Sequence, residues 1–194
     1  MSGGPYLNNA GVFLVQTLFG FYILTVMLRF LLQTVRADFY NPLVQFLVKL
    51  TNPPLVPLRR MIPGFQGMDL AAIVLMMVLK STELVLLFTF SGHALGVVTI
   101  LLLAIAELLG LLINILFWGV IIQAVLSWIN PNPHHPAVSL LRQITEPVLS
   151  PARRILPPIS GIDLSPILVL VALQLINMLL VAPLRDMAFG TLAG

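Results

Sequence analysis

The sequence has no cysteine among its 194 residues. Disulfides, thiolate metal sites, haem attachment through a C-x-x-C-H motif and cysteine nucleophiles are therefore excluded. Charged residues are also few, since they make up 9% of the chain against about 25% of a typical soluble domain. Hydrophobic residues make up 59%, and the mean hydropathy is +1.04. These values exclude an intrinsically disordered chain and argue against a water-soluble enzyme.

Recognisable catalytic and nucleotide-binding motifs are missing too. The sequence contains no Walker A motif, no glycine-rich dinucleotide loop and no G-x-S-x-G. Its basic residues are not interleaved with aromatic residues, so we expect no nucleic-acid partner. His93, His134 and His135 form no cluster with acidic residues at helix ligand spacing, which argues against metal or haem ligation. We predict a protein that is not an enzyme and has no cofactor; the role of His134 and His135 stays open.

Four apolar stretches are long enough to cross a bilayer, which takes about 20 residues per helix. Backbone polar groups in lipid must be paired within the segment, so each stretch is predicted to be an α-helix. The third lies inside an apolar run of 36 residues, 94–129, and residues 91–105 could extend a helix, lie at the outer interface or belong to a fifth span. The four predicted spans are 11–34, 70–90, 106–129 and 164–181.

Basic residues are concentrated in two loops between the predicted spans, which hold seven of the ten Lys and Arg residues. The positive-inside rule places both loops in the cytoplasm. Two loops on one side require an even number of crossings between them, so this distribution favours four spans with both termini outside. The residues are Arg36, Lys49, Arg59 and Arg60 in the first loop and Arg142, Arg153 and Arg154 in the second.

The chain repeats itself with a shift of 94 residues: residues 42–73 align with 136–167 without a gap, and 14 of the 32 pairs are identical. The identities include four prolines, two arginines, a glycine and an aspartate, which a shared apolar bias would not produce. The expected fold is therefore all-α: a polytopic membrane protein with four transmembrane helices arranged as two parallel two-span repeats. Repeat 1 covers residues 1–90, an apolar linker 91–105, repeat 2 106–184 and a tail 185–194.

Both loops carry the pattern T-x-P-x-L-x-P-x-R-R-x-x-P-x-x-x-G-x-D-L. Before it, residues 42–50 and 136–144 are amphipathic and are predicted to form short helices in the headgroup region. Proline fixes φ and lacks an N–H, so the prolines of the pattern are expected to end these helices. Asp69 and Asp163 stand just before the next spans, where a carboxylate can cap the start of a helix.

The arginine pairs of the two loops, Arg59–Arg60 and Arg153–Arg154, have two interpretations. They could dock phospholipid headgroups, an acidic residue of a partner or a small anion, because arginine pairs bidentately with such groups. Alternatively, they set the topology and close each loop on its own aspartate, Asp69 or Asp163. Both interpretations stay open at the level of the sequence.

Several polar residues lie within the predicted spans, where charge is costly and typically functional. Lys80 and Glu83 are three residues apart on one helix face, so they can pair. Polar residues recur at three pairs of positions 94 residues apart, which favours faces turned toward a shared interior or a subunit interface. One interpretation is a permeation or ion-coupling site, and the other is a neutralised network that holds helices together. The candidate residues are Arg29, Lys80, Glu83, Glu107, Gln123, Gln174 and Asn177.

With its doubled loop motif, the chain resembles the YggT family of small bacterial membrane proteins over about residues 11–181. The resemblance implies links to cytochrome cofactor assembly in plastids, to cell division or nucleoid arrangement and, in bacteria, to osmotic stress tolerance. We hypothesise a non-enzymatic inner-membrane scaffold or assembly factor that contacts membrane lipids and a membrane or cytoplasmic protein partner. The alternative is a small channel or transporter for ions or osmolytes that uses Lys80 and Glu83 and forms a homo-oligomer to enclose a path.

Overall fold

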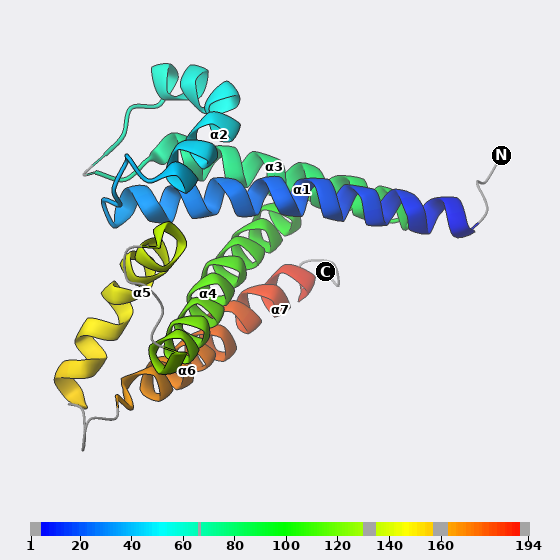
Figure 1. Cartoon of the computed structure of the whole chain (residues 1–194). Helices are drawn as coiled ribbons and strands as arrows, with labels where there is room; N and C mark the ends of the chain where they lie inside the picture. Colours follow the sequence, from blue (N-terminus) through cyan, green and yellow to red (C-terminus); the bar gives the residue numbers. More distant parts are fainter. Residues whose placement is uncertain (1–4, 66, 130–134, 157–162, 191–194) are drawn as a thin grey trace.

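The computed structural model describes residues 5–65, 67–129, 135–156 and 163–190 (Figure 1). A π-helical segment, η1 (Asn177–Val181), joins the last two α-helices. The described ranges contain no β-strand, so the predicted all-α class is confirmed. The α-helices are α1 (Pro5–Thr34), α2 (Pro42–Met61), α3 (Leu70–Phe90), α4 (Val97–Ile129), α5 (Pro136–Ile155), α6 (Ser165–Ile176) and α7 (Ala182–Gly190).

Four helical segments are long and apolar enough to cross a membrane, as predicted. The third begins at Val97, so much of the apolar linker extends α4 toward its N-terminus. The fourth continues through η1 and α7, so residues 185–190, expected in the tail, are helical. The four segments are Tyr6–Thr34, Leu70–Phe90, Val97–Ser127 and Ser165–Gly190.

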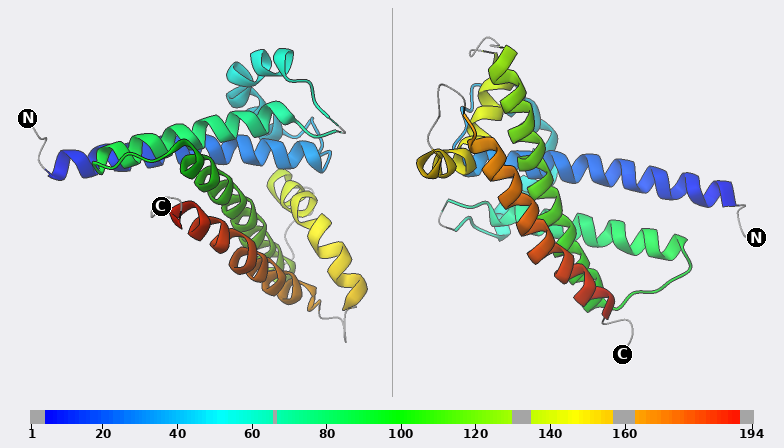
Figure 2. Two further views of the ribbon diagram at one scale, coloured as in Figure 1. Left: turned by 180° about the vertical axis from the view of Figure 1, so that it is seen from behind. Right: turned by 90° about the horizontal axis from the view of Figure 1, so that it is seen from below.

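Each half of the chain forms a pair of packed spans with a loop helix beside it. α1 packs along α3, α4 packs along α6 and α7, and the two pairs cross each other (Figures 1 and 2). The loop helices α2 and α5 begin next to each other. Asn41, which caps α2, donates from its side-chain amide to the carbonyl of Pro136, the first residue of α5, at 3.0 Å. Both loop helices therefore lie on the same side of the four spans, as parallel repeats require.

Several buried positions recur 94 residues apart. Val26 and Val120, which are 94 residues apart, are both 0% exposed, and Leu55 and Leu149 are 0% and 1% exposed. Val26 and Leu55 lie in one core, which also includes Leu108, Leu140 and Ile144 of the second half. Val120 and Leu149 lie in a second core, whose buried residues all belong to the second half. A third cluster around Leu84 joins α3 to α4 and α7. The duplication read in the sequence is therefore also a duplication of packing.

The loop helices are longer than predicted, because their prolines do not end them. α2 continues through Pro53, Pro54 and Pro57 to its last residue, and α5 continues through Pro147 and Pro151. A proline inside a helix removes one backbone hydrogen bond and costs about 3 kcal/mol. The expectation of short helices over 42–50 and 136–144 was therefore wrong, and packing against the spans offsets this cost.

α2 contains one proline, Pro54, that has no counterpart in α5, and a tertiary contact compensates for its missing N–H. Pro54 lacks the N–H that would bond to the carbonyl of Leu50, and this carbonyl accepts a hydrogen bond from the hydroxyl of Tyr22 at 3.4 Å. The second half has Val148 in place of Pro54 and Leu116 in place of Tyr22. The hydroxyl is thus present in the half whose helix has the additional proline.

Candidate functional site

The first arginine of each pair closes its loop on the aspartate before the next span. Arg59 Nε lies 3.1 Å from Asp69 Oδ2, and Arg59 Nη2 contacts the same oxygen. Asp69 is 4% exposed, and its other carboxylate oxygen accepts from the backbone N–H of Ala72 at 3.3 Å. One buried carboxylate therefore neutralises a loop arginine and caps the start of α3.

The second loop is closed in the same way. Arg153 Nε lies 2.9 Å from Asp163 Oδ2, and Asp163 Oδ1 accepts from the backbone N–H of Ser165 at 2.9 Å. Burial raises the pKa of Asp163, but hydrogen bonds from Ser165 and Arg153 outweigh burial and hold this pKa below its usual value. Glu146, which the sequence did not single out, lies 2.9 Å from Arg153 Nη1 and adds a second carboxylate.

The second arginine of each pair has a different environment. Arg60 and Arg154 are exposed, and neither makes a hydrogen bond or ion pair with the residues that the structure describes. Each is followed by an exposed apolar side chain, Met61 at 80% and Ile155 at 76%. The pair therefore divides its roles, since one arginine closes the loop and the other presents its charge to the surroundings.

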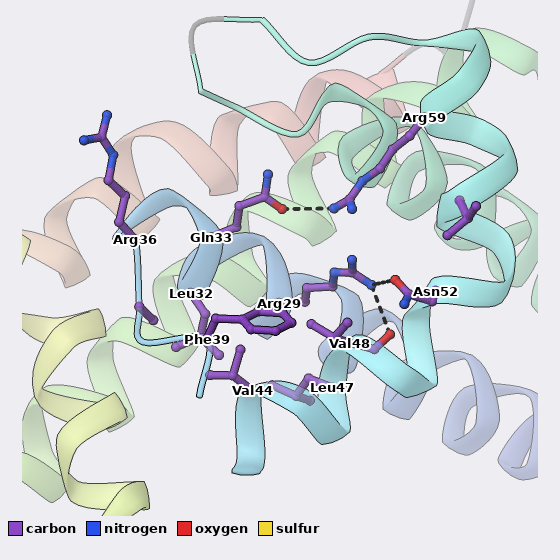
Figure 3. Close-up of a pocket in the computed structure, with 12 residues that line it drawn as sticks. Arg29, Leu32, Gln33, Arg36, Phe39, Val44, Leu47, Val48, Asn52 and Arg59 are labelled. Atoms are coloured by element: carbon purple, nitrogen blue, oxygen red, sulfur yellow. Dashed lines mark hydrogen bonds between the residues drawn. The ribbon is translucent and has the colours of Figure 1, made fainter. Parts of the chain in front are cut away.

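Arg29 lies inside the protein and bonds to the loop helix α2. It is 7% exposed, and its Nη1 donates to Thr51 Oγ1 at 2.5 Å. The same nitrogen donates to Asn52 Oδ1 at 2.9 Å and to the carbonyl of Val48 at 3.3 Å (Figure 3). An arginine near the end of a span can extend its flexible stem to the membrane interface. The structure instead shows a bridge between α1 and α2.

The same bridge recurs in the second half with a neutral side chain. Gln123, 94 residues after Arg29, accepts a hydrogen bond from Thr145, 94 residues after Thr51. Both threonines are 0% exposed. Thr51 and Thr145 belong to the repeated motif, but nothing in the pattern assigned them a role. Threonine occurs at both repeat positions, and a polar residue occurs at both 29 and 123. These two recurrences together could have predicted the contact.

Two ion pairs lie within the remaining spans. Lys80 Nζ lies 3.0 Å from Glu83 Oε2, as their spacing allows, and both side chains are largely buried. Glu107 Oε1 lies 3.0 Å from Nη2 of Arg185, a residue that the sequence placed in the tail. Lys80, Glu107 and Arg185 line a cavity of about 180 Å³ where the two halves meet, together with Asn114.

The seven polar candidates therefore do not form one network. Arg29 and Gln123 bond to the loop helices, whereas Lys80 and Glu83 pair within α3. Gln174 is exposed on α6, and its neighbour Asn177 is the first residue of η1. The sequence pattern found polar positions that recur, but the crossing of the two halves separates them.

The remaining candidates are structural or lie outside the described ranges. His135 Nδ1 accepts from the backbone N–H of Ala137 at 3.3 Å and caps α5, as Asn41 caps α2. His134 falls outside the described residues. Within the part of the chain that the structure describes, no group of three or more His, Asp or Glu side chains is placed to hold a metal ion.

These observations define a multi-pass membrane protein built from a duplicated unit of span, loop helix and span. The model of the CCB3/YggT family matches the chain twice, over residues 8–90 and 102–184. The chain belongs to this family, and the two matches are 94 residues apart, like the two halves of the sequence.

Full-length relatives support the same assignment. An uncharacterized protein of Pseudomonas aeruginosa is 44% identical over 183 residues, covering 93% of each chain. A Vibrio alginolyticus protein is 41% identical over 175 residues, covering 89% of this chain and 94% of its own length. The uncharacterized protein YggT of Escherichia coli K12 is 36% identical over 177 residues, covering 88% of each chain. No solved structure matches.

Proposed function

We propose that this protein is a non-enzymatic scaffold or assembly factor of the bacterial inner membrane, with both loop helices on the cytoplasmic side. The observation that carries the proposal is the exposed pair at the end of each loop helix, Arg60–Met61 and Arg154–Ile155. The assembly of a membrane complex and the response to osmotic stress are two of the settings that the family resemblance implies.

The chemistry of this pair favours a protein partner. Arg59 and Arg153 already close the loops, so loop structure does not require a second arginine. An arginine beside a large apolar side chain suits a surface that has a carboxylate next to an apolar pocket, because arginine and buried apolar residues dominate many interfaces. Two copies of the pair on one side of the membrane would let one partner contact both.

A photo-crosslinking side chain at position 61 and, separately, at position 155 tests the proposal in cells. We expect one and the same membrane or cytoplasmic protein at both positions, and we expect Arg60→Glu together with Arg154→Glu to remove the crosslink. Crosslinks to lipid alone, or a protein crosslink that survives the charge reversal, would reject the partner role. Crosslinks to a second copy of the chain would identify a homo-oligomer instead.

The cavity between the halves favours a second candidate, a small channel or transporter. Three of the four charged side chains around this region, Lys80, Glu107 and Arg185, line the cavity, and Glu83 pairs with Lys80. The purified protein in liposomes should show no ion or osmolyte flux if it is a scaffold. Flux that is abolished by Lys80→Met together with Glu83→Gln would reject the scaffold in favour of the channel.

A further inference from the structure

A cavity of about 610 Å³ lies between the end of α1 and α2 (Figure 3). Three arginines line it, Arg29, Arg36 and Arg59, while much of the remaining wall is apolar and includes Phe39. We propose that this cavity binds the headgroup of an anionic phospholipid, with the lipid phosphate between Arg29 and Arg59. The inference does not depend on the proposed scaffold role, because it concerns the purified protein and its lipids.

Arg29 has donors to spare. A guanidinium carries five N–H groups, and all the hydrogen bonds of Arg29 to described residues come from Nη1. The N–H groups of Nη2 and Nε make no hydrogen bond within the described residues. In Figure 3 the guanidinium lies below the hydrogen bond that joins Gln33 to Arg59, so these donors face the cavity. A phosphate oxygen placed there would accept from them.

Arg29 also forms no ion pair with a described residue, and the carboxylate that acts on it from a distance, Asp69, is already paired with Arg59. The seven Asp and Glu residues of the sequence all lie in the described ranges, and five of them form ion pairs with other cations. None of these pairs includes Arg29. A buried charge without an ion pair of its own is costly, so the site is suited to an additional anion that the chain itself does not supply.

Arg59 adds a second cation on the opposite side of the cavity. Its Nε and Nη2 bond to Asp69, and Nη2 also donates to Gln33 Oε1 at 3.0 Å, which leaves Nη1 with no hydrogen bond to a described residue. Asp69 therefore neutralises one of the two guanidinium groups. The charge that remains between Arg29 and Arg59 complements one phosphate diester.

The location and the walls of the cavity favour a lipid over a free anion. Arg29 is five residues from the last residue of α1, which places it about 8 Å below the helix end at 1.5 Å per residue. That depth suits a phosphate at the headgroup level. Phe39 and Val56, which are 58% and 43% exposed, give the cavity an apolar edge next to which glycerol and acyl chains can lie.

The second half of the chain lacks this charge pattern. Gln123 stands in place of Arg29, Asn130 in place of Arg36, and Glu146 in place of Asn52. The remaining arginine of this set, Arg153, pairs with both Glu146 and Asp163. Three arginines on the first half therefore correspond to a single, fully paired arginine on the second, so the cavity charge is not a by-product of the repeated fold.

Arg36 occupies a backbone conformation that favours glycine over arginine. It follows α1 with φ of 53°, the left-handed region that favours glycine, and its N–H and that of Ala37 bond to the carbonyls of Gln33 and Leu32. Glycine would suit this position better, yet a cation occupies it at the rim of the cavity, with its side chain extending away from Arg29 in Figure 3.

Native mass spectrometry of the delipidated protein tests the site with defined lipids. We expect phosphatidylglycerol to bind about tenfold more tightly than phosphatidylcholine. Arg29→Gln or Asn52→Glu should each reduce this preference about five- to tenfold. Both substitutions install the residue that the second half uses at the same position, and Asn52→Glu keeps Arg29. Arg36→Gly should lower the preference about twofold without loss of thermal stability.

Arg142→Gln is the matched control, because it removes one exposed arginine from α5, away from the cavity. It should retain the preference of the unchanged protein. If the control lost as much of the lipid preference, the preference would come from general surface charge and the site would be rejected. The absence of any preference in the unchanged protein would also reject the site. A short-chain phosphatidylglycerol should raise the unfolding temperature where inorganic phosphate at the same concentration does not; equal shifts would overturn the lipid assignment in favour of a soluble anion.

Discussion

The two halves of the molecule share several buried positions but distribute charge differently around their loop helices. In the first half, Arg29 is buried against α2 without a carboxylate partner, next to Asn52. In the second, Gln123 takes the place of Arg29, and Glu146 takes the place of Asn52 beside Arg153. A duplication can thus keep its packing while one copy carries a charged cavity and the other neutralises it.

The comparison separates what packing requires from what charge adds. Thr51 and Thr145 are fully buried and hydrogen-bonded in both halves, whether their partner is a cation or a neutral amide. The contact between span and loop helix therefore does not require an arginine. The charge of Arg29 belongs to the first half alone, which makes it a candidate for function.

Replacing the two loop aspartates should reveal the largest difference between the halves. Asp69→Asn removes the charge from a carboxylate that is 4% exposed, so we expect a loss of about 2–3 kcal/mol in the free energy of unfolding. Asp163 is 34% exposed, so Asp163→Asn should cost less than half as much. Unfolding in mild detergent, followed by intrinsic fluorescence, measures both. Equal losses would contradict the idea that burial distinguishes the two loops.

Close packing of α4 against α5 can be tested at Gly119. A Cβ at this position would lie 3.0 Å from Thr145 Cγ2, so Gly119→Ala should destabilise the protein by about 1–2 kcal/mol. Gly20 on α1 is the control, because a Cβ there would meet no atom within 4 Å. Gly20→Ala should be neutral or slightly stabilising. A neutral Gly119→Ala would show that this contact is looser than the structure indicates.

Backbone strain after α1 predicts a gain in stability. Arg36 has φ of 53°, a conformation that costs a residue other than glycine about 1–2 kcal/mol. The greater conformational freedom of glycine in the unfolded chain offsets part of this energy. Arg36→Gly should therefore stabilise the protein by at most about 1 kcal/mol. Thermal unfolding measures the change, and Arg36→Ala, which retains the strain, should not show it.

Acidic pH should weaken the second loop through Asp163. Because its pKa in the folded protein is lowered from 3.8, the ionised carboxylate stabilises the fold above about pH 4, and this contribution is lost as the pH falls through the lowered value. The difference in unfolding temperature between the unchanged protein and Asp163→Asn should therefore shrink from pH 7 to pH 3. A difference that grows toward low pH would contradict this sign.

The smallest effect is expected at Glu146. Its ion pair with Arg153 joins side chains that are 42% and 31% exposed, and such pairs contribute at most about 0.5–1 kcal/mol. Glu146→Asn, which restores the residue of the first half, should therefore change the stability by less than about 0.5 kcal/mol. A large loss would show that Asp163 alone does not hold Arg153.

The sequence by itself determined the class of this protein, its four spans and its duplication. Apolar stretches of spanning length require helices, because lipid offers backbone groups no other partners. The shift of 94 residues followed from prolines, arginines and an aspartate in register, and the family match has the same spacing. The capping aspartates and the Lys80–Glu83 pair were within reach as well, since they depend on neighbours close in the chain.

The tertiary structure decided which distant groups meet. The sequence could not show that α2 runs through its prolines, because the hydroxyl that reaches Leu50 comes from Tyr22, 28 residues away. Nor could it place Glu107 beside Arg185, since that pair forms where α4 packs against α7. Local preferences act over a few residues, whereas these contacts exist only after the helices have packed, so the packing selects the partner of each polar group.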